Sequence, residues 1–346
     1  MDLFVEEEIL TPVKRTETFR GGRVLSGYRP SGRLHLGHYF GTLTNWIRLQ
    51  HEFECFFFVA DWHALTTIYE DTSQLQNDIQ DMVLDWLAVG LDPEKCKIYR
   101  QSDLPEVAEL ALYLSMLTPL PWLERNPTYK DQMQELKGKE IATHGFLGYP
   151  VLQAADILLV QGQFVPVGED QLSHLELARE IVRRFNNFYG QYFTEPQPLL
   201  SPAKKIIGTD GRKMSKSYNN AIYLTDSPTE VKEKTKIMIT DPARIRVSDP
   251  GHPEVCSVYW LHQIVSEEIL SDIKEKCMKG QRGCVACKSI LAETVNSSLE
   301  DFRDKRKELE EETDLLEELL ARGAKQVKPV AHLTIEDVRK RINIRE

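Results

Sequence analysis

Short apolar strands alternate with amphipathic helices through the first half of the chain, and this alternation limits the possible folds more than any other feature. Residues 55–60 (CFFFVA) form a continuous apolar run, as expected of a strand that is buried on both faces. Shorter strands are expected at 23–28, 96–99 and 164–167. Strands that alternate with helices build βαβ units and hence a parallel sheet. The sequence therefore predicts the α/β class, in which ligands bind beyond the carboxyl ends of the strands.

Helices are expected between these strands at residues 35–50, 75–87 and 110–117. The second of them carries signals at both ends, because Ser73 and Gln76 have the spacing of a capping box and Gly90 tolerates the positive φ of a helix end. One apolar face at helical spacing should pack on the sheet, and it consists of Leu75, Ile79, Met82, Val83, Trp86 and Leu87. Two cysteines in the strands, Cys55 and Cys96, are expected to be core residues.

Charge and segment composition exclude several broad classes of protein. The formal net charge of −10 argues against a broad, nonspecific nucleic-acid binder, although a local basic face stays open. Residues 1–20 have no long apolar run, so neither a signal peptide nor a membrane-spanning helix is expected there. Six cysteines without a secretory signal indicate the cytoplasm, which is reducing.

A glycine-rich segment, GYRPSGRLHLGH at residues 27–38, follows the first strand and leads into a helix. A helix start presents free N–H groups and a positive dipole end to an anion. His35 and His38 share a helix face and can both donate to phosphate oxygens. Gly37 between them leaves room for a base or ribose to lie on the backbone. Taken alone, the motif fits an ordinary helix start with two surface histidines equally well.

A second motif lies 175 residues after His38, where Lys213, Met214, Ser215, Lys216 and Ser217 follow a glycine-flanked turn. Two lysines with hydroxyl groups on a mobile loop can close over a pyrophosphate. Mobility suits this role, because charge accumulates on the leaving group only in the transition state. A solvated basic loop is the alternative interpretation of this segment.

Together the two motifs resemble those of the class I aminoacyl-tRNA synthetases. Three further segments resemble tryptophanyl-tRNA synthetase, and they are VADWHALT at 59–66, YPVLQAADIL at 149–158 and VPVGEDQ at 165–171. The resemblance begins at about residue 23 and extends to the end of the chain. It implies a tryptophan–tRNA ligase that uses ATP with Mg²⁺, forms tryptophanyl-adenylate with release of diphosphate, and loads tRNA(Trp) with release of AMP. It also implies a homodimer.

The resemblance assigns the ATP site residue by residue. It implies catalytic roles for His35, His38, Lys213 and Lys216. The residues that it places around ATP are Arg29, Pro30, Ser31, Gly37, His38, Gly168, Glu169, Asp170, Lys213, Met214, Ser215, Lys216 and Ser217. Carboxylates on ribose hydroxyls, as implied for Glu169 and Asp170, are ordinary chemistry in nucleotide sites.

The resemblance also implies a tryptophan site made of Gly27, His63, Tyr149, Gln153 and Asp156. The last three have the i, i+4, i+7 spacing that places side chains on one helix face. An ionised carboxylate only accepts hydrogen bonds and indole only donates one, so Asp156 suits the indole N–H. A buried carboxylate without a donor is penalised, which would reject phenylalanine.

Two positions depart from many bacterial members of the family, which have Gln where Arg29 stands and Met where Gln153 stands. The Tyr-x-x-x-Gln-x-x-Asp pattern also resembles tyrosyl-tRNA synthetase, in which the carboxylate meets a phenol hydroxyl. Tyrosine is therefore the alternative substrate. A non-catalytic paralogue that binds RNA or senses tryptophan is the alternative from another class of protein, and the intact histidines and lysines argue against it.

The last four cysteines, Cys256, Cys277, Cys284 and Cys287, form a C-x20-C-x6-C-x2-C pattern. A tetrahedral zinc site and a [4Fe-4S] cluster both use four cysteines, and the spacing does not decide between them. The resemblance to a branch of bacterial tryptophanyl-tRNA synthetases implies a [4Fe-4S] cluster. A local positive face is expected from nearby basic residues, which are Arg244, Arg246, Lys279, Arg282 and Lys288.

These features divide the chain into three parts. We expect an N-terminal extension at 1–20 and a Rossmann-like, parallel-sheet catalytic domain at 21–228. From residue 229 the strand signals fade and charged helical sequence follows, so 229–346 should be an α-helical, anticodon-binding domain that holds the cysteines.

Overall fold

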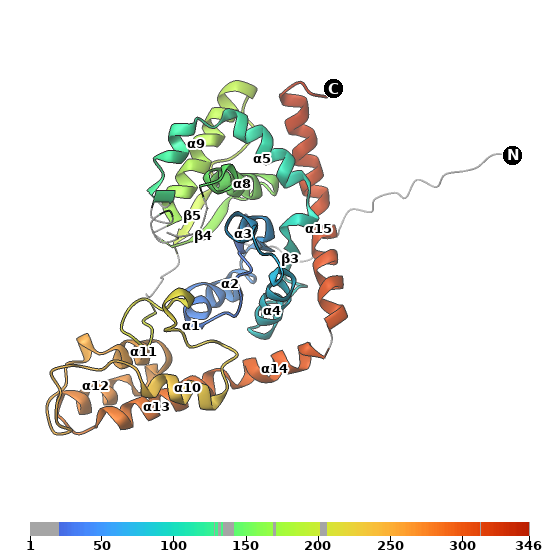
Figure 1. Cartoon of the computed structure of the whole chain (residues 1–346). Helices are drawn as coiled ribbons and strands as arrows, with labels where there is room; N and C mark the ends of the chain where they lie inside the picture. The colour runs from blue at the N-terminus through green and yellow to red at the C-terminus, as the bar shows by residue number, and fades with distance from the viewer. Residues whose placement is uncertain are drawn as a thin grey trace.

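A five-stranded parallel sheet forms the centre of the larger body, in the order β3-β2-β1-β4-β5 (Figure 1). The computed structural model describes residues 21–127, 129–130, 133, 142–168, 171–200, 206–311 and 313–345. The strands are β1 (Arg23–Tyr28), β2 (Glu54–Val59), β3 (Cys96–Arg100), β4 (Phe164–Val167) and β5 (Gln197–Leu200). The predicted Rossmann-like parallel sheet is confirmed, and the strand order reverses between β1 and β4, which is where such sheets bind ligands.

Strand β2 needs its continuous apolar run because both of its faces are covered. Cys55, Phe57 and Val59 join the hydrophobic core on one side of the sheet. Phe56 and Phe58 join a second core on the other side. A strand with one solvated face would alternate polar and apolar residues instead. Cys96 of β3 is buried beside Cys55, so the prediction that both are core residues is confirmed.

Helices cover the two faces of the sheet. One face is covered by a continuous helical segment and by α4 (Leu75–Ala88). The segment consists of α1 (Leu36–His38), a π-helical turn at Tyr39–Leu43 and α2 (Thr44–Leu49). The other face is packed by α5 (Glu106–Leu117), α8 (His144–Leu159) and α9 (Leu172–Tyr189). Two short helices, α3 (Asp61–Ile68) and α6 (Leu120–Glu124), follow β2 and α5.

The start of α4 differs from the prediction, but its end does not. The helix begins at Leu75 with Gln74 as its N-cap and has no side-chain cap bond, so the predicted capping box of Ser73 and Gln76 is wrong. The preceding turn is held differently, because the N–H of Ser73 donates to Asp71 Oδ1 at 2.9 Å. Gly90, at φ +107°, ends the helix as predicted.

Residues 228–310 form a helical body that lies beside the sheet domain (Figure 1). Its helices are α10 (Pro228–Lys236), α11 (Ser257–Val265), α12 (Leu270–Met278), α13 (Cys284–Ser298) and α14 (Glu300–Glu310). Arg306 of α14 is buried against α4, where it pairs with Asp81 at 2.7 Å and with Asp85. This ion-paired contact connects the helical body to one face of the sheet domain.

The last helix, α15 (Thr313–Arg341), returns to the sheet domain and runs along β3 and α5 (Figure 1). A Cβ atom on Gly323 would lie only 1.8 Å from the carbonyl oxygen of Ile98, so a glycine is needed at this close approach. Val327, Ile335 and Val338 belong to the same core as α5 and α8. The domain boundary at 229 stays a prediction, and this helix packs apart from the rest of 229–346. Among the described residues, no helix is both long enough and apolar enough to cross a membrane.

Candidate active site

The two motifs that the sequence separates by 175 residues are joined by backbone hydrogen bonds. The N–H of Leu36 donates to the carbonyl of Ile222, and the N–H of Leu224 donates to the carbonyl of Leu34, both at 3.0 Å. Residues 222–224 lie five to seven positions after the end of the KMSKS segment, and residues 34–36 include His35. The predicted histidine and lysine motifs therefore lie side by side at the carboxyl end of β1.

Lys216 is the lysine that contacts the glycine-rich loop. Its Nζ donates to the carbonyl oxygens of Ser31 at 2.9 Å and Gly32 at 2.8 Å. Burial lowers the pKa of Lys216 to about 8, while the nearby Asp78 and Asp85 carboxylates act in the opposite direction. At neutral pH the amine thus carries its charge, and its neutral carbonyl partners can be exchanged for phosphate oxygens.

The two histidines are held as neutral hydrogen-bond donors. Nδ1 of His35 accepts the N–H of Gly37 at 3.0 Å, and Nδ1 of His38 accepts the N–H of His35 at 3.1 Å. A neutral imidazole with an accepting Nδ1 carries its proton on Nε2. Burial, followed by the Lys216 cation, lowers the pKa of His35 to about 4. Burial and the neighbouring His35 lower the pKa of His38 well below its usual value. Both rings therefore offer an Nε2–H to an anion.

Two glycines of the first motif have packing reasons that the sequence did not reveal. A Cβ atom on Gly37 would lie 2.7 Å from the His35 ring, so this glycine makes space for the ring that caps the helix start. A Cβ atom on Gly27 would lie 2.6 Å from the Phe58 ring of the neighbouring strand. The expected contacts of Gly37 with ATP and of Gly27 with tryptophan stay predictions.

The KMSKS loop is shaped by Asn220, which the sequence analysis missed. The Oδ1 of this buried residue accepts the N–H of Ser215 at 2.8 Å. Its Nδ2 donates to the carbonyl of Lys213 at 3.1 Å and to Asp210 at 2.6 Å. Met214 is buried beneath the loop, and Lys213 is exposed. One side chain thus fixes the backbone on both sides of Met214 and leaves the Lys213 amine free to reach outward.

A second cluster of predicted residues surrounds Asp156 of α8. This carboxylate is 3% exposed, and His63 Nε2 lies 3.0 Å from its Oδ2. The buried Gln101, which follows β3, donates to both carboxylate oxygens. Gln101 was missed, although it follows the carboxyl end of a strand just as His63 does. Desolvation raises the pKa of Asp156, while the bonds to His63 and Gln101 work against that rise.

Tyr149 lies on the same helix as Asp156 and connects the cluster to α9. Its hydroxyl lies 2.6 Å from Nε2 of His174, and its ring lies edge-on to His63 at 6.5 Å between centroids. Burial raises the pKa of Tyr149 to about 12, and the Arg29 cation acts in the opposite direction. Arg29 therefore lies near Tyr149, at the boundary between the predicted ATP and tryptophan sites. Gln153 is half-buried on the same helix.

The remaining ATP-site predictions lie around these two clusters. Pro30 is buried and Ser31 is exposed in the glycine-rich loop. The hydroxyls of Ser215 and Ser217 pair at 2.8 Å within the KMSKS loop. Gly168 follows the carboxyl end of β4, whereas Glu169 and Asp170 lie outside the described residues. The described candidates thus come from the end of β1, from the segments after β1, β2 and β4, from α8 and from the KMSKS loop.

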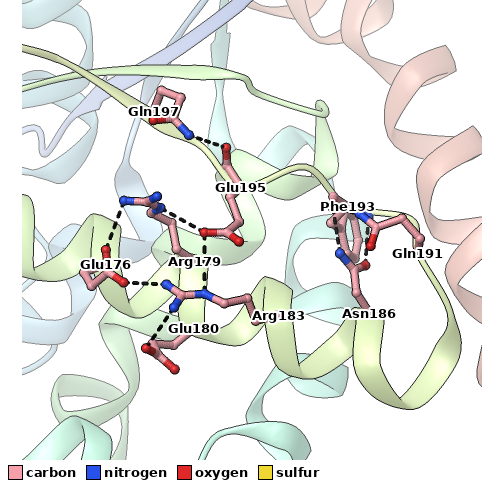
Figure 2. A network of polar contacts seen from close by, with 9 residues as sticks. All are labelled: Glu176, Arg179, Glu180, Arg183, Asn186, Gln191, Phe193, Glu195 and Gln197. Atoms are coloured by element: carbon pink, nitrogen blue, oxygen red, sulfur yellow. Dashed lines mark hydrogen bonds and ion pairs between the residues drawn. The ribbon is translucent and has the colours of Figure 1, made fainter.

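An open hollow of about 570 Å³ lies elsewhere, between α9 and the segment that leads to β5 (Figure 2). It contains two guanidinium groups, those of Arg179 and Arg183. Both contact Glu195 and Glu176, and Arg183 also pairs with Glu180 (Figure 2). The carboxylates neutralise the arginines, so this hollow is poorly suited to a triphosphate.

The four late cysteines lie in one neighbourhood. Nη1 of Arg244 is 3.8 Å from the sulfur of Cys277 and 4.0 Å from that of Cys284. Burial raises the pKa of Cys287 to about 12, and the other three cysteines contribute to that rise. Within the described ranges, no group of three or more His, Cys, Asp or Glu side chains is arranged to hold a metal ion. The predicted metal site therefore stays a prediction.

The predicted positive face near these cysteines is partly neutralised. Lys279 pairs with Glu275 at 2.5 Å, and Arg282 pairs with Asp272 at 2.6 Å. Lys288 donates to a backbone carbonyl at 2.9 Å rather than to a carboxylate. A solvated ion pair attracts a phosphate backbone less than a free cation does, so the expected face is weaker than the sequence indicated.

Comparison with known proteins agrees with this geometry. Residues 19–300 match a family profile described as "tRNA synthetases class I (W and Y)". The chain is 49% identical to the tryptophan–tRNA ligase of Thermotoga maritima, over 93% of this chain and 99% of that protein. It is 44% identical to the Aquifex aeolicus tryptophan–tRNA ligase, over 93% of this chain and all of that protein. It also resembles the crystal structure of Campylobacter jejuni tryptophanyl-tRNA synthetase complexed with ADP and tryptophan, with a TM-score of 0.85, 36% identity, and coverage of 93% and 99% of the two chains. The chain therefore belongs to the class I tRNA synthetase family and, within it, to the tryptophan–tRNA ligases.

Proposed function

We propose that this tryptophan–tRNA ligase makes tryptophanyl-adenylate where the two motifs meet, and then transfers the aminoacyl group to tRNA(Trp). The observation that supports this most is the backbone pairing of residues 34–36 with 222–224, together with the contact of Lys216 on Ser31 and Gly32. A triphosphate on the glycine-rich loop would meet two N–H donors and two cations. Phosphoryl-group chemistry depends mostly on such positioning and charge stabilisation.

In the first reaction, a carboxylate oxygen of tryptophan bonds to the α-phosphorus while the bond from that phosphorus to the bridging oxygen of diphosphate breaks. His35 and His38 donate Nε2–H bonds to phosphate oxygens. Lys213 and Lys216 stabilise the charge that moves to the leaving diphosphate. Mg²⁺ bound to ATP neutralises part of the same charge. A tRNA terminal hydroxyl then takes the aminoacyl group and AMP leaves.

The rest of the ATP site is also a proposal. Arg29, Pro30, Ser31 and Gly37 belong to the glycine-rich segment, Gly168 follows β4, and Met214, Ser215 and Ser217 belong to the lysine segment. Glu169 and Asp170 follow Gly168 in the chain and are proposed to bind the ribose and the adenine edge. A carboxylate accepts hydrogen bonds from ribose hydroxyls, which suits these two residues to that role.

The proposed tryptophan site is the cluster around Asp156. Its carboxylate is the acceptor for the indole N–H, and His63 borders the ring. Tyr149 and Gln153 face the ammonium group, with Gly27 at the end of β1. The burial of Asp156 supports this assignment, because a buried acceptor discriminates strongly against substrates without a donor.

Exchange of labelled pyrophosphate into ATP tests this function directly. We expect exchange that depends on tryptophan, and at least about 100-fold weaker exchange with tyrosine, since its smaller ring does not carry its donor to the position of the indole N–H. Exchange with tyrosine alone would identify a tyrosine enzyme. No exchange with either amino acid, despite measurable binding of tryptophan, would identify a non-catalytic paralogue.

We further propose that Cys256, Cys277, Cys284 and Cys287 hold a [4Fe-4S] cluster in an anticodon-binding part of 229–346. The four thiols are the ligand set of such a cluster, they lie in one neighbourhood, and the guanidinium of Arg244 can offset its negative charge. Amino-acid activation needs no redox step, so the role of the cluster would be structural. The cluster would hold together the segments around α11, α12 and α13.

Iron and sulfide analysis of protein purified without oxygen tests the cluster. We expect about four irons per chain and a visible absorption band, both lost in Cys284→Ser. Zinc in place of iron would support the alternative metal, and an absence of both metals would contradict the proposal. Cys55→Ser, in the core of the sheet, is the control that should leave the iron content unchanged.

Two further expectations are part of the proposal. A homodimer is supported by exposed apolar side chains on α5 and α6, with Leu112 55%, Met116 73% and Leu120 60% exposed. Light scattering of Leu112→Glu/Met116→Glu should show monomers if these side chains form the interface. We place the protein in the cytoplasm, where unpaired cysteines stay reduced.

A further inference from the structure

We propose that Gln101 is a specificity-determining positioning residue, which holds the Asp156 carboxylate so that one acceptor site faces a ring N–H. The inference rests on the proposed tryptophan site and goes beyond it. Gln101 belongs to the turn Gln101–Asp103 directly after β3. It is fully buried, and it acts on the substrate through Asp156 rather than by contact.

The amide of Gln101 fixes both ends of the carboxylate. Its Nε2 lies 2.8 Å from Asp156 Oδ1 and 3.0 Å from Oδ2. A carboxylate that is held at both oxygens cannot rotate about its own axis. His63 Nε2 adds a third bond, at 3.0 Å from Oδ2. The plane and direction of the carboxylate are thus set before any substrate arrives.

The Asp156 carboxylate keeps one hydrogen-bond acceptor site open. An ionised carboxylate has about four lone-pair sites, two on each oxygen. Among the residues that the structure describes, Oδ2 of Asp156 meets two donors, Gln101 and His63, whereas Oδ1 meets only Gln101. One site on Oδ1 therefore remains for a further donor. A single donor is what an indole ring offers.

The oxygen of the Gln101 amide indicates that this residue is needed for its N–H donors. Oε1 of Gln101 is buried and meets no hydrogen-bond donor among the described residues. Burying an acceptor without a donor is unfavourable, and an apolar side chain at this position would avoid that cost. A residue needed only to fill space would therefore not be a glutamine. The amide is explained by its donation to Asp156.

A buried carboxylate keeps Gln101 in place beside His63. Oδ1 of Asp61 accepts the N–H of Ser102 at 3.2 Å and the N–H of Trp62 at 3.0 Å. Ser102 is the neighbour of Gln101, and Trp62 is the neighbour of His63. Asp61 thus ties the turn after β3 to the start of α3. Both donors to Asp156 are positioned from the carboxyl ends of neighbouring strands.

The test compares tryptophan with benzothienylalanine, in which sulfur replaces the ring N–H. The ratio of kcat/KM for the two amino acids in pyrophosphate exchange measures how far the enzyme uses that N–H. We expect Gln101→Met, which keeps the length but removes the donors, to reduce this ratio about tenfold or more. The KM for ATP should change less than about twofold, because ATP lies on the other side of the site.

Gln50→Met is the matched control. Gln50 is also buried, and its amide bonds the carbonyl of Gly90 at 3.1 Å and the N–H of Asp92 at 2.9 Å, away from the site. This variant should lower the melting temperature and leave the substrate ratio unchanged. If Gln101→Met lowers kcat/KM equally for both amino acids, Gln101 is only structural and the inference is wrong.

Gln101→Glu provides a second readout that keeps the shape of the side chain. As an ionised carboxylate it cannot donate to Asp156, but once protonated it can donate one hydrogen bond. The substrate ratio should therefore fall at pH 8 and recover as the pH is lowered toward 6. A wild-type ratio at every pH would overturn the inference. Absence of any tryptophan-dependent exchange in the unaltered enzyme would instead refute the proposed function.

Discussion

The phosphate side and the ring side of the site are built in opposite ways. On the ring side, Asp156 is buried and meets three hydrogen-bond contacts from Gln101 and His63. On the phosphate side, Lys213 is exposed and Lys216 rests on two backbone carbonyls that a ligand can replace. Under the proposed function, selection of the amino acid depends on a fixed, buried network, whereas catalysis depends on cations that are open to a ligand.

The electrostatics of the two sides follow the same division. Burial disfavours the charged forms of both Asp156 and Lys216, but different groups offset it. Asp156 is hydrogen-bonded by the buried Gln101 and His63, whereas Lys216 is stabilised by the charges of Asp78 and the buried Asp85. Lys216 keeps partial contact with solvent and has acidic neighbours on α4. Changes to the Asp156 network should therefore weaken tryptophan binding, whereas changes to Lys216 should lower the turnover number.

The largest effect should come from Lys216→Ala. We expect the turnover number for pyrophosphate exchange to fall about 100- to 1,000-fold, as when a donor that stabilises transition-state charge is removed. Tryptophan binding, measured by calorimetry, should change less than about twofold, because the ring side is untouched. A loss of turnover below about tenfold would show that Lys216 does not stabilise the leaving diphosphate.

The next largest effect should come from Asp156→Asn, which keeps the size of the side chain and removes its charge. The asparagine can turn a donor toward the indole N–H, so we expect the KM for tryptophan to rise about 10- to 100-fold. Titration of ATP in the same assay should give an unchanged KM. A change confined to the turnover number would contradict the division between the two sides.

A smaller effect should appear in the pH dependence. Lys216 is charged below its pKa of about 8 and neutral above it, so kcat/KM for ATP should fall as the pH rises from 8 to 9. His35, with a pKa of about 4, stays neutral from pH 6 to 9 and should cause no loss in that range. Lys216→Ala should abolish the alkaline limb. An alkaline limb that persists in that variant would belong to another group.

The smallest effect should come from Asn220→Ala. This residue only shapes the KMSKS backbone, through bonds to Ser215 and Lys213, and the lysines themselves remain. The loss of one or two net hydrogen bonds corresponds to a fall in turnover of about 5- to 20-fold. Asn219→Gly, at the exposed neighbouring position and compatible with its positive φ, tests whether the effect is specific to the buried amide.

The sequence predicted those parts of the structure that depend on short, contiguous patterns of residues. The apolar run of β2 and the helix signals around α4 predicted the parallel sheet, and the two motifs indicated the proposed phosphate side. Gln101 and Asn220 escaped because their roles depend on tertiary contacts, with Asp156 lying 55 residues away from Gln101. The capping box at Ser73 failed because Asp71 holds that turn instead. The position of α15 against β3 depends on a close approach at Gly323, which no periodicity reveals.

The proposed activation reaction requires one triphosphate to be held jointly by the two motifs, and a double-mutant cycle measures that most directly. Turnover in pyrophosphate exchange is compared for His38→Ala, Lys216→Ala and the double variant. Residues that act on one transition state should be coupled by at least about 1 kcal/mol, so the double variant should lose less than the product of the single losses. Losses that multiply, with no coupling, would contradict a shared nucleotide site.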